Sequence, residues 1–358
     1  MAEAVQSPRF RHDVYALSAV FFFVFMGAGA QQAYLIPYLT QVAGWSAVRG
    51  SLLLACVYVS MLVFRVGNLR LFPVWTDRRY TIVGSFTYCL FTVFMAAMAV
   101  APSYPLAMAA AALWGCGAAM MWTGTSMQVM RLSDLAGGRH GTGMGILYMS
   151  TQAGWLYGAI LLGRLYRALA TGNLALLYVT AAAVTLVGCL TALTLPATGT
   201  PVRHLPTWGA LAGIMRRERA QIAGALQFLA ALAYGLILGV FGRYVKERYG
   251  SEWLWITVSL YPATQMLLAL AGGRLGDRLG HGPVLVAAFL TGTAGLALAA
   301  AAPSVAVAAV LAVSLGALNS TVSVTASALV GKAASSERRP IDRKSTRLHS
   351  SHRIRSRM

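Results

Sequence analysis

The stretch Gly273-Arg274-Leu275-Gly276-Asp277-Arg278-Leu279-Gly280-His281-Gly282-Pro283 is a polar, glycine-punctuated island between two long apolar runs. Its glycines can adopt positive φ, and they also allow two helices to approach closely. We therefore predict a tight, charged hinge between two membrane helices. Gly273, Gly276 and Gly280 would make the turn, and Asp277 and Arg278 would face water and lipid headgroups.

The composition of the whole chain is typical of a membrane protein. Of its 358 residues, 58% are hydrophobic and 11% are charged, whereas soluble domains carry about 25% charged residues. About 20 apolar residues span a bilayer as a helix, and none of the long runs alternates with the period of two that marks an outer-membrane strand. Ten runs are predicted as helices, near residues 15–39, 49–67, 80–100, 105–129, 141–163, 173–195, 221–242, 253–272, 283–302 and 304–328.

The formal net charge of +19 is best explained by membrane topology. In a soluble protein such an excess would suggest nucleic-acid binding. If the N-terminus is cytoplasmic, sixteen Lys and Arg residues lie in inside segments and six lie in outside segments, which is the positive-inside bias. We therefore predict a protein of the inner or plasma membrane with a cytoplasmic N-terminus. Its partners would be membrane lipid and a small-molecule substrate, not nucleic acid, and we expect a monomer.

Nothing in the cysteines and histidines predicts a metal site, a cofactor site or a catalytic nucleophile. Cys56, Cys89, Cys116 and Cys189 fall in four different apolar runs without a C-x-x-C pair, and all six histidines lie outside the runs. A membrane-embedded enzyme would need a cluster of His, Asp or Glu at one membrane face, and the sequence offers none. We expect no cofactor and no enzymatic activity.

The polar segment 196–220, with three prolines and a basic cluster, divides the chain into two sets of helices. We predict a six-helix bundle over 1–195, a cytoplasmic linker over 196–220 and a partial bundle of four helices over 221–330.

The island G-x-L-x-D-R-x-G resembles the cytoplasmic loop signature of the major facilitator superfamily of secondary transporters. The resemblance implies an all-α fold of two helical bundles with the substrate near the bilayer midplane between them. A counterpart loop is expected between the second and third runs. There Asp77 and Arg78 keep the acid followed by arginine, but the glycine spacing is lost.

The segment 331–358 follows the tenth run, where the resemblance would require helices eleven and twelve. It is strongly basic and cannot span a membrane. One interpretation is a disordered basic tail on the cytoplasmic leaflet, where polybasic segments bind anionic lipid. The other, which we favour, is that Arg343–His352 resembles a translated sequencing adapter fused to a broken gene, so that the chain is non-native from about residue 342.

Polar residues at mid-helix depth are the candidates for substrate binding, because an unpaired polar group in lipid costs free energy. Amides, hydroxyls and aromatic rings suit a neutral or zwitterionic polar solute. The alternative is that they only bond one helix to another. In runs that the resemblance assigns to the cavity, the candidates are Gln31, Gln32, Trp122, Thr123, Gln128, Gln227, Tyr234, Asn319 and Ser320.

Charged groups are scarce within the runs. No Asp, Glu or His lies at mid-depth, so a carboxylate proton relay is not visible. Transport could be uncoupled, could use another ion, or could depend on a residue of the missing helices. Arg65 is the one charge well inside an apolar run, and we expect it to extend to the membrane interface rather than to bind an anion.

The resemblance also implies a role for the two loop acids, each of which would lie at the N-terminus of a helix in the opposite bundle. Asp277 should face the start of the fifth run, near Arg139–Gly143, whereas Asp77 would need helix eleven. We thus predict a secondary transporter of a small polar solute that works by alternating access. The alternatives are a non-transporting membrane scaffold or receptor-like protein, and an inactive fragment of a transporter.

Overall fold

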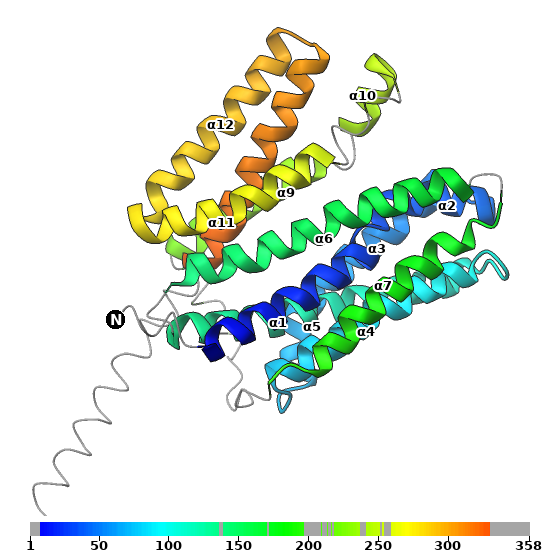
Figure 1. The fold of residues 1–358 in the computed structure, drawn as a ribbon, viewed down its shortest axis with the longest axis horizontal. Helices are drawn as coiled ribbons and strands as arrows, with labels where there is room; N and C mark the ends of the chain where they lie inside the picture. The colour runs from blue at the N-terminus through cyan, green and yellow to red at the C-terminus, as the bar shows by residue number, and fades with distance from the viewer. Residues whose placement is uncertain are drawn as a thin grey trace, which may run out of the picture.

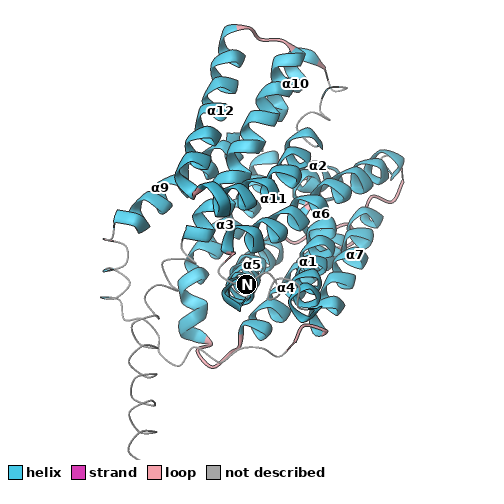
Figure 2. Cartoon of the chain, turned by 60° about the vertical axis from the view of Figure 1, so that its left-hand side comes forward, coloured by secondary structure: helices cyan, strands magenta, loops and turns pink. Residues whose placement is uncertain are grey.

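The computed structural model describes residues 8–135, 139–169, 172–196, 209, 213, 216, 218–236, 241–250, 253 and 259–329. Within these ranges the chain forms helices, turns and short loops and no strands (Figure 2), so the predicted all-α fold is confirmed. The helices are α1 (Pro8–Val24), η2 (Phe25–Gly29), α2 (Gln32–Ala43), α3 (Ala47–Leu71), α4 (Asp77–Ala97), α5 (Tyr104–Leu135), α6 (His140–Leu169), α7 (Ala175–Leu193), α9 (Glu218–Leu236), α10 (Gly242–Tyr249), α11 (Tyr261–Leu279), α12 (His281–Ala301) and a final one, Val305–Leu329, called the last helix below.

Seven of these segments are long and apolar enough to cross a membrane. They are α1 with η2, most of α3, and all of α4, α5, α7, α12 and the last helix. Three further predicted runs correspond to α6, to α9 and to α11. The predicted total of ten membrane helices therefore stays a prediction.

The first predicted run is interrupted. One turn of π-helix, η2, separates α1 from α2 at Phe25–Gly29, and Pro37 lies inside α2. A Cβ added to Gly27 would lie 2.3 Å from the carbonyl oxygen of Ala181 in α7, so glycine lets the two backbones pack directly against each other. Such π-turns are frequent at functional sites, and Phe25 of η2 lines the cavity described below.

Two apolar cores build two halves. The larger core is formed by residues of all helices from α1 through α7. The smaller core is formed by residues of α9, α10, α11, α12 and the last helix. Ala269 of α11 and Val324 of the last helix belong to the larger core. The second half is therefore packed against the first through these two helices.

The halves meet along α6 and α11, which run antiparallel (Figure 1). A Cβ on Gly141 would lie 2.6 Å from the carbonyl oxygen of Gly273, and a Cβ on Gly145 would lie 2.7 Å from that of Ala269. We call this contact, Gly141–Gly145 against Ala269–Gly273, the joint. Figure 1 shows α12 and the last helix leaning away from the first half at the opposite end.

The predicted hinge was wrong in its local structure. Gly273 and Gly276 lie inside α11, and only Gly280, with φ of 91°, has the positive φ of a turn. Gly273 is needed for the close approach to α6 instead. Asp277 is only partly exposed and contacts α6, whereas Arg278 faces outward as predicted.

The predicted linker 196–220 falls largely outside the described residues, although α9 already begins at Glu218. The predicted tail, 331–358, lies wholly outside them.

Candidate functional site

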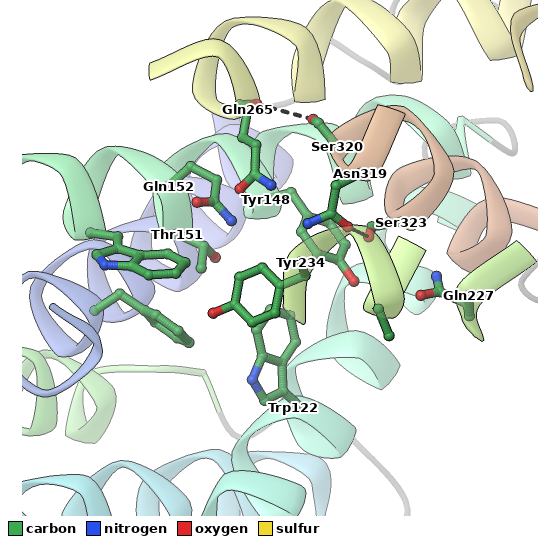
Figure 3. Close-up of a pocket in the computed structure, with 13 residues that line it drawn as sticks. Trp122, Tyr148, Thr151, Gln152, Gln227, Tyr234, Gln265, Asn319, Ser320 and Ser323 are labelled. Atoms are coloured by element: carbon green, nitrogen blue, oxygen red, sulfur yellow. Dashed lines mark hydrogen bonds between the residues drawn. The ribbon is translucent and has the colours of Figure 1, made fainter. Parts of the chain in front are cut away.

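A cavity of about 230 Å³ lies between the two halves. Its wall in the first half comes from η2, α5 and α6, and its wall in the second half comes from α9, α11 and the last helix (Figure 3). The lining residues are Phe25, Trp122, Tyr148, Thr151, Gln152, Trp155, Gln227, Ala231, Tyr234, Gln265, Asn319, Ser320 and Ser323. Five of the nine predicted binding residues are therefore brought together here: Trp122, Gln227, Tyr234, Asn319 and Ser320.

Some polar groups of this cavity already have partners within the protein. The Asn319 amide donates to the Tyr261 hydroxyl at 2.7 Å, and its oxygen accepts from Ser323 at 3.3 Å. Ser320 donates to the backbone oxygen of Gln265 at 3.0 Å. The bonds to Tyr261 and Gln265 hold the last helix against α11, and all three bonds fix side chains that face the cavity.

Other polar groups are left without a protein partner. The amide oxygens of Gln152 and Gln265 are buried and accept no hydrogen bond from the described residues. Buried polar atoms are normally satisfied, so these two oxygens are acceptors that water or a bound solute can use. Next to them the rings of Trp155 and Tyr234 meet across the two halves at a centroid distance of 5.7 Å.

A second cavity, of about 210 Å³, adjoins the first. The two share Phe25, Trp122, Tyr148 and Tyr234 as walls, and α3 closes the second one with Val57, Tyr58, Met61 and Arg65. Gln32, another predicted binding residue, lines this second cavity, where its side-chain oxygen accepts from the Tyr58 hydroxyl at 2.8 Å.

The remaining three predicted binding residues line neither cavity. Gln31 is buried in the first half and donates to Thr92 at 3.1 Å, and Gln128 donates to Thr81 at 2.9 Å. Both amides therefore bond one helix to another, which is the alternative that the sequence left open. Thr123 is partly exposed next to Trp122 but is not part of either wall.

Arg65 is a cavity residue that was not among the predicted binding residues. It is exposed at the end of the apolar span Ala47–Arg65, and it also lines the second cavity. The signal was present in the sequence, because Tyr58, Met61 and Arg65 are spaced by three and four residues and so share one face of α3.

The joint ends in a charged contact. Asp277 accepts hydrogen bonds from the backbone N–H groups of Gly141 at 3.2 Å and Thr142 at 2.7 Å, and from the Thr142 hydroxyl at 3.0 Å. These groups form the first turn of α6, where the helix dipole favours a negative charge. Asp277 thus lies at the position that the loop resemblance implies for it.

Asp77 has a different environment. It is 3% exposed and forms an ion pair with Arg131 of α5. The neighbouring Arg78 donates to the backbone oxygen of Leu193 at 2.6 Å. All these partners lie in the first half, so these bonds of the Asp77 loop hold one bundle together.

Acidic and metal-binding side chains do not gather at either cavity. Among the described residues, no group of three or more His, Cys, Asp or Glu side chains could hold a metal ion. The geometry is that of a binding chamber between two bundles.

Comparison with known proteins agrees with this architecture. The family model of the Major Facilitator Superfamily matches residues 17–340. The chain matched no curated protein sequence. It is similar to the crystal structure of FucP, a Major Facilitator Superfamily transporter in the outward conformation, with a TM-score of 0.67, 15% identity and 88% of each chain covered. It is also similar to a variant of the E. coli fucose:proton symporter FucP, with a TM-score of 0.65, 16% identity and 88% of each chain covered. The chain is therefore an integral membrane protein that belongs to the Major Facilitator Superfamily of secondary transporters.

Proposed function

We propose that this protein moves a small polar solute across the membrane by alternating access and binds it in the cavities between its two halves. The observation that carries the proposal is that residues of both halves line the first cavity. A solute that contacts both halves can couple its binding to their relative movement.

The lining chemistry supports a polar organic solute. Trp122, Tyr148, Trp155 and Tyr234 supply flat apolar surface, and the free amide oxygens of Gln152 and Gln265 supply hydrogen-bond acceptors. A largely apolar pocket with a few fixed polar groups is the usual form of a small-molecule site.

The direction in which the cavity opens follows from the proposed topology. With a cytoplasmic N-terminus, the start of α6, where Asp277 of α11 and the joint lie, is on the cytoplasmic side. The joint would then seal the cytoplasmic end, and the cavity would open to the outside of the inner or plasma membrane. The similarity to FucP in an outward conformation supports this assignment.

Cysteine accessibility tests the proposal. The four native cysteines would be replaced, and Gln227→Cys, Asn319→Cys and the control Gln128→Cys would be introduced singly. A membrane-impermeant thiol reagent would then be applied to right-side-out and to inside-out vesicles. We expect both cavity positions to react from either side, and faster from outside, because Gln227 and Asn319 face the cavity, whereas Gln128 is only 4% exposed and should stay unreactive.

Two outcomes would contradict the proposal. If neither cavity position reacts from either side, the hypothesis of a water-accessible central cavity is wrong. Reaction from one side only, under all conditions, would indicate a static protein and favour the scaffold alternative.

A further inference from the structure

Arg65 gives the second cavity a positive charge. It lies on α3 seven residues after Tyr58, and both side chains line this cavity together with Gln32. Tyr88 and Tyr148 line the same cavity, so the guanidinium shares its wall with their hydroxyls.

No described acid neutralises this charge. Neither a hydrogen bond nor an ion pair joins Arg65 to another residue in the described part of the chain. The acids whose side chains are described are Asp13, Asp77, Asp134, Glu218 and Asp277, and none of them lines either cavity.

An unpaired guanidinium in this position attracts anions. Apolar walls of low dielectric constant focus its field into the cavity, and aromatic side chains and Met61 form most of those walls. The guanidinium also presents five N–H donors in a planar fork that matches the two oxygens of a carboxylate.

We propose that Arg65 binds the anionic group of the transported solute, so that the substrate is a polar organic monoanion. This inference rests on the proposed function and narrows its substrate class. The two cavities share Phe25, Trp122, Tyr148 and Tyr234. One small solute can therefore place its charged end at Arg65 and its polar body against the amides of the first cavity.

The test measures the sign of the potential in the cavity. In the cysteine-replaced protein, Met61→Cys places a thiol in the same cavity, four residues from Arg65 and so about one helical turn away. The reagents are the anionic 2-sulfonatoethyl methanethiosulfonate and the cationic 2-trimethylammonioethyl methanethiosulfonate, which have similar sizes and opposite charges. Their reaction rates are compared at low ionic strength.

Arg65→Gln should lower the ratio of the anionic rate to the cationic rate about tenfold, because the charge acts on the two reagents with opposite sign at a separation of about 7 Å. Arg65→Lys should keep most of the ratio, and added salt should reduce it. Arg70→Gln is the matched control. It removes one cation from the same helix at an exposed position that lines neither cavity. Arg65→Met serves as a second neutral variant if the Gln variant does not fold.

An unchanged ratio in Arg65→Gln or Arg65→Met would overturn the anion site and leave the proposed transport function standing. An equal fall in Arg70→Gln would overturn it as well, since the effect would then reflect the general charge of α3. If Met61→Cys reacts with neither reagent, the cavity is closed to water, and both this inference and the proposed function fail.

Discussion

Replacement of Asp277 by Asn should weaken the joint between the halves. From α6 the carboxylate accepts a hydrogen bond from Gly141 on one oxygen and two hydrogen bonds from Thr142 on the other. Asparagine keeps a single acceptor oxygen, and its NH₂ group would face a backbone N–H of α6 that it cannot satisfy. The substitution also removes the charge from the positive end of the helix dipole.

The expected magnitude follows from these contacts. A hydrogen bond to a charged group contributes about 1.5–3 kcal/mol, and a charge at a helix end contributes about 0.3–1 kcal/mol. Asp277 is only partly buried, so water can replace part of what is lost. We expect a net loss of about 2 kcal/mol, which shifts the equilibrium between closed and open joint about 30-fold towards the open state.

Distance measurements between two spin labels would detect this shift. Leu135 at the end of α5 and Leu279 at the end of α11 flank the joint and are 72% and 65% exposed, so labels there should be tolerated. In Asp277→Asn the distance distribution should broaden towards longer distances.

Asp77→Asn is the matched control for this experiment. Its partners Arg131 and Arg78 lie in the first half, so it should lower thermal stability and leave the label distance unchanged. The reasoning is refuted if Asp277→Asn leaves the distribution unchanged, or if both substitutions shift it equally.

Two further substitutions test the close helix approach at the joint and the structural role of Gln128. Gly273→Ala should open the joint, because its Cβ would lie 2.2 Å from the Gly141 carbonyl oxygen, whereas Gly282→Ala meets no atom within 4 Å. The same spin-label distance reports both, and an unchanged distance in Gly273→Ala would contradict the close approach. Gln128→Leu should destabilise the first half by about 0.5–1.5 kcal/mol, since it removes the amide that donates to the buried Thr81, whose hydroxyl keeps its bonds with Asp77 and Thr125. A thermal-unfolding midpoint should fall while the reactivity of Asn319→Cys stays unchanged, and a loss of that reactivity would place Gln128 at the cavity after all.

The sequence predicted the helices well because a bilayer leaves the backbone few choices. Every buried backbone N–H and C=O group must be satisfied within the segment, so apolar runs such as 283–302 correspond closely to helices such as His281–Ala301. The local structure of the charged island 273–283 was harder to predict. Polarity and glycine content suggested a loop over the whole length of the island. Residues 273–279 nevertheless continue α11, because Asp277 finds its donors on α6 and Gly273 packs against that helix.

The binding residues could be predicted only in part. Position along a helix shows how deep a polar side chain lies, but not which neighbour it meets. Gln31 and Gln32 are adjacent in sequence, yet Gln31 bonds to Thr92 inside the first half and Gln32 lines the second cavity. Arg65 was not among the predicted binding residues for a similar reason. Its distance from the helix end favoured an interfacial position, and only the tertiary structure shows that its face of α3 borders the second cavity.

Helix α6 connects the joint with the binding chamber. Its first turns form the joint through Gly141, Thr142 and Gly145, and the next two turns place Tyr148, Thr151, Gln152 and Trp155 in the cavity wall. A rigid helix cannot move at one of these sites without moving at the other. A solute that draws Trp155 and Tyr234 together would therefore shift α6 and disturb its contact with α11 at the joint. Release of Asp277 from Thr142 would in turn move the side chains of α6 that line the cavity. By linkage, any solute that binds the closed-joint state more tightly must bind Asp277→Asn more weakly, so solute affinity and the spin-label distance should change together in this variant.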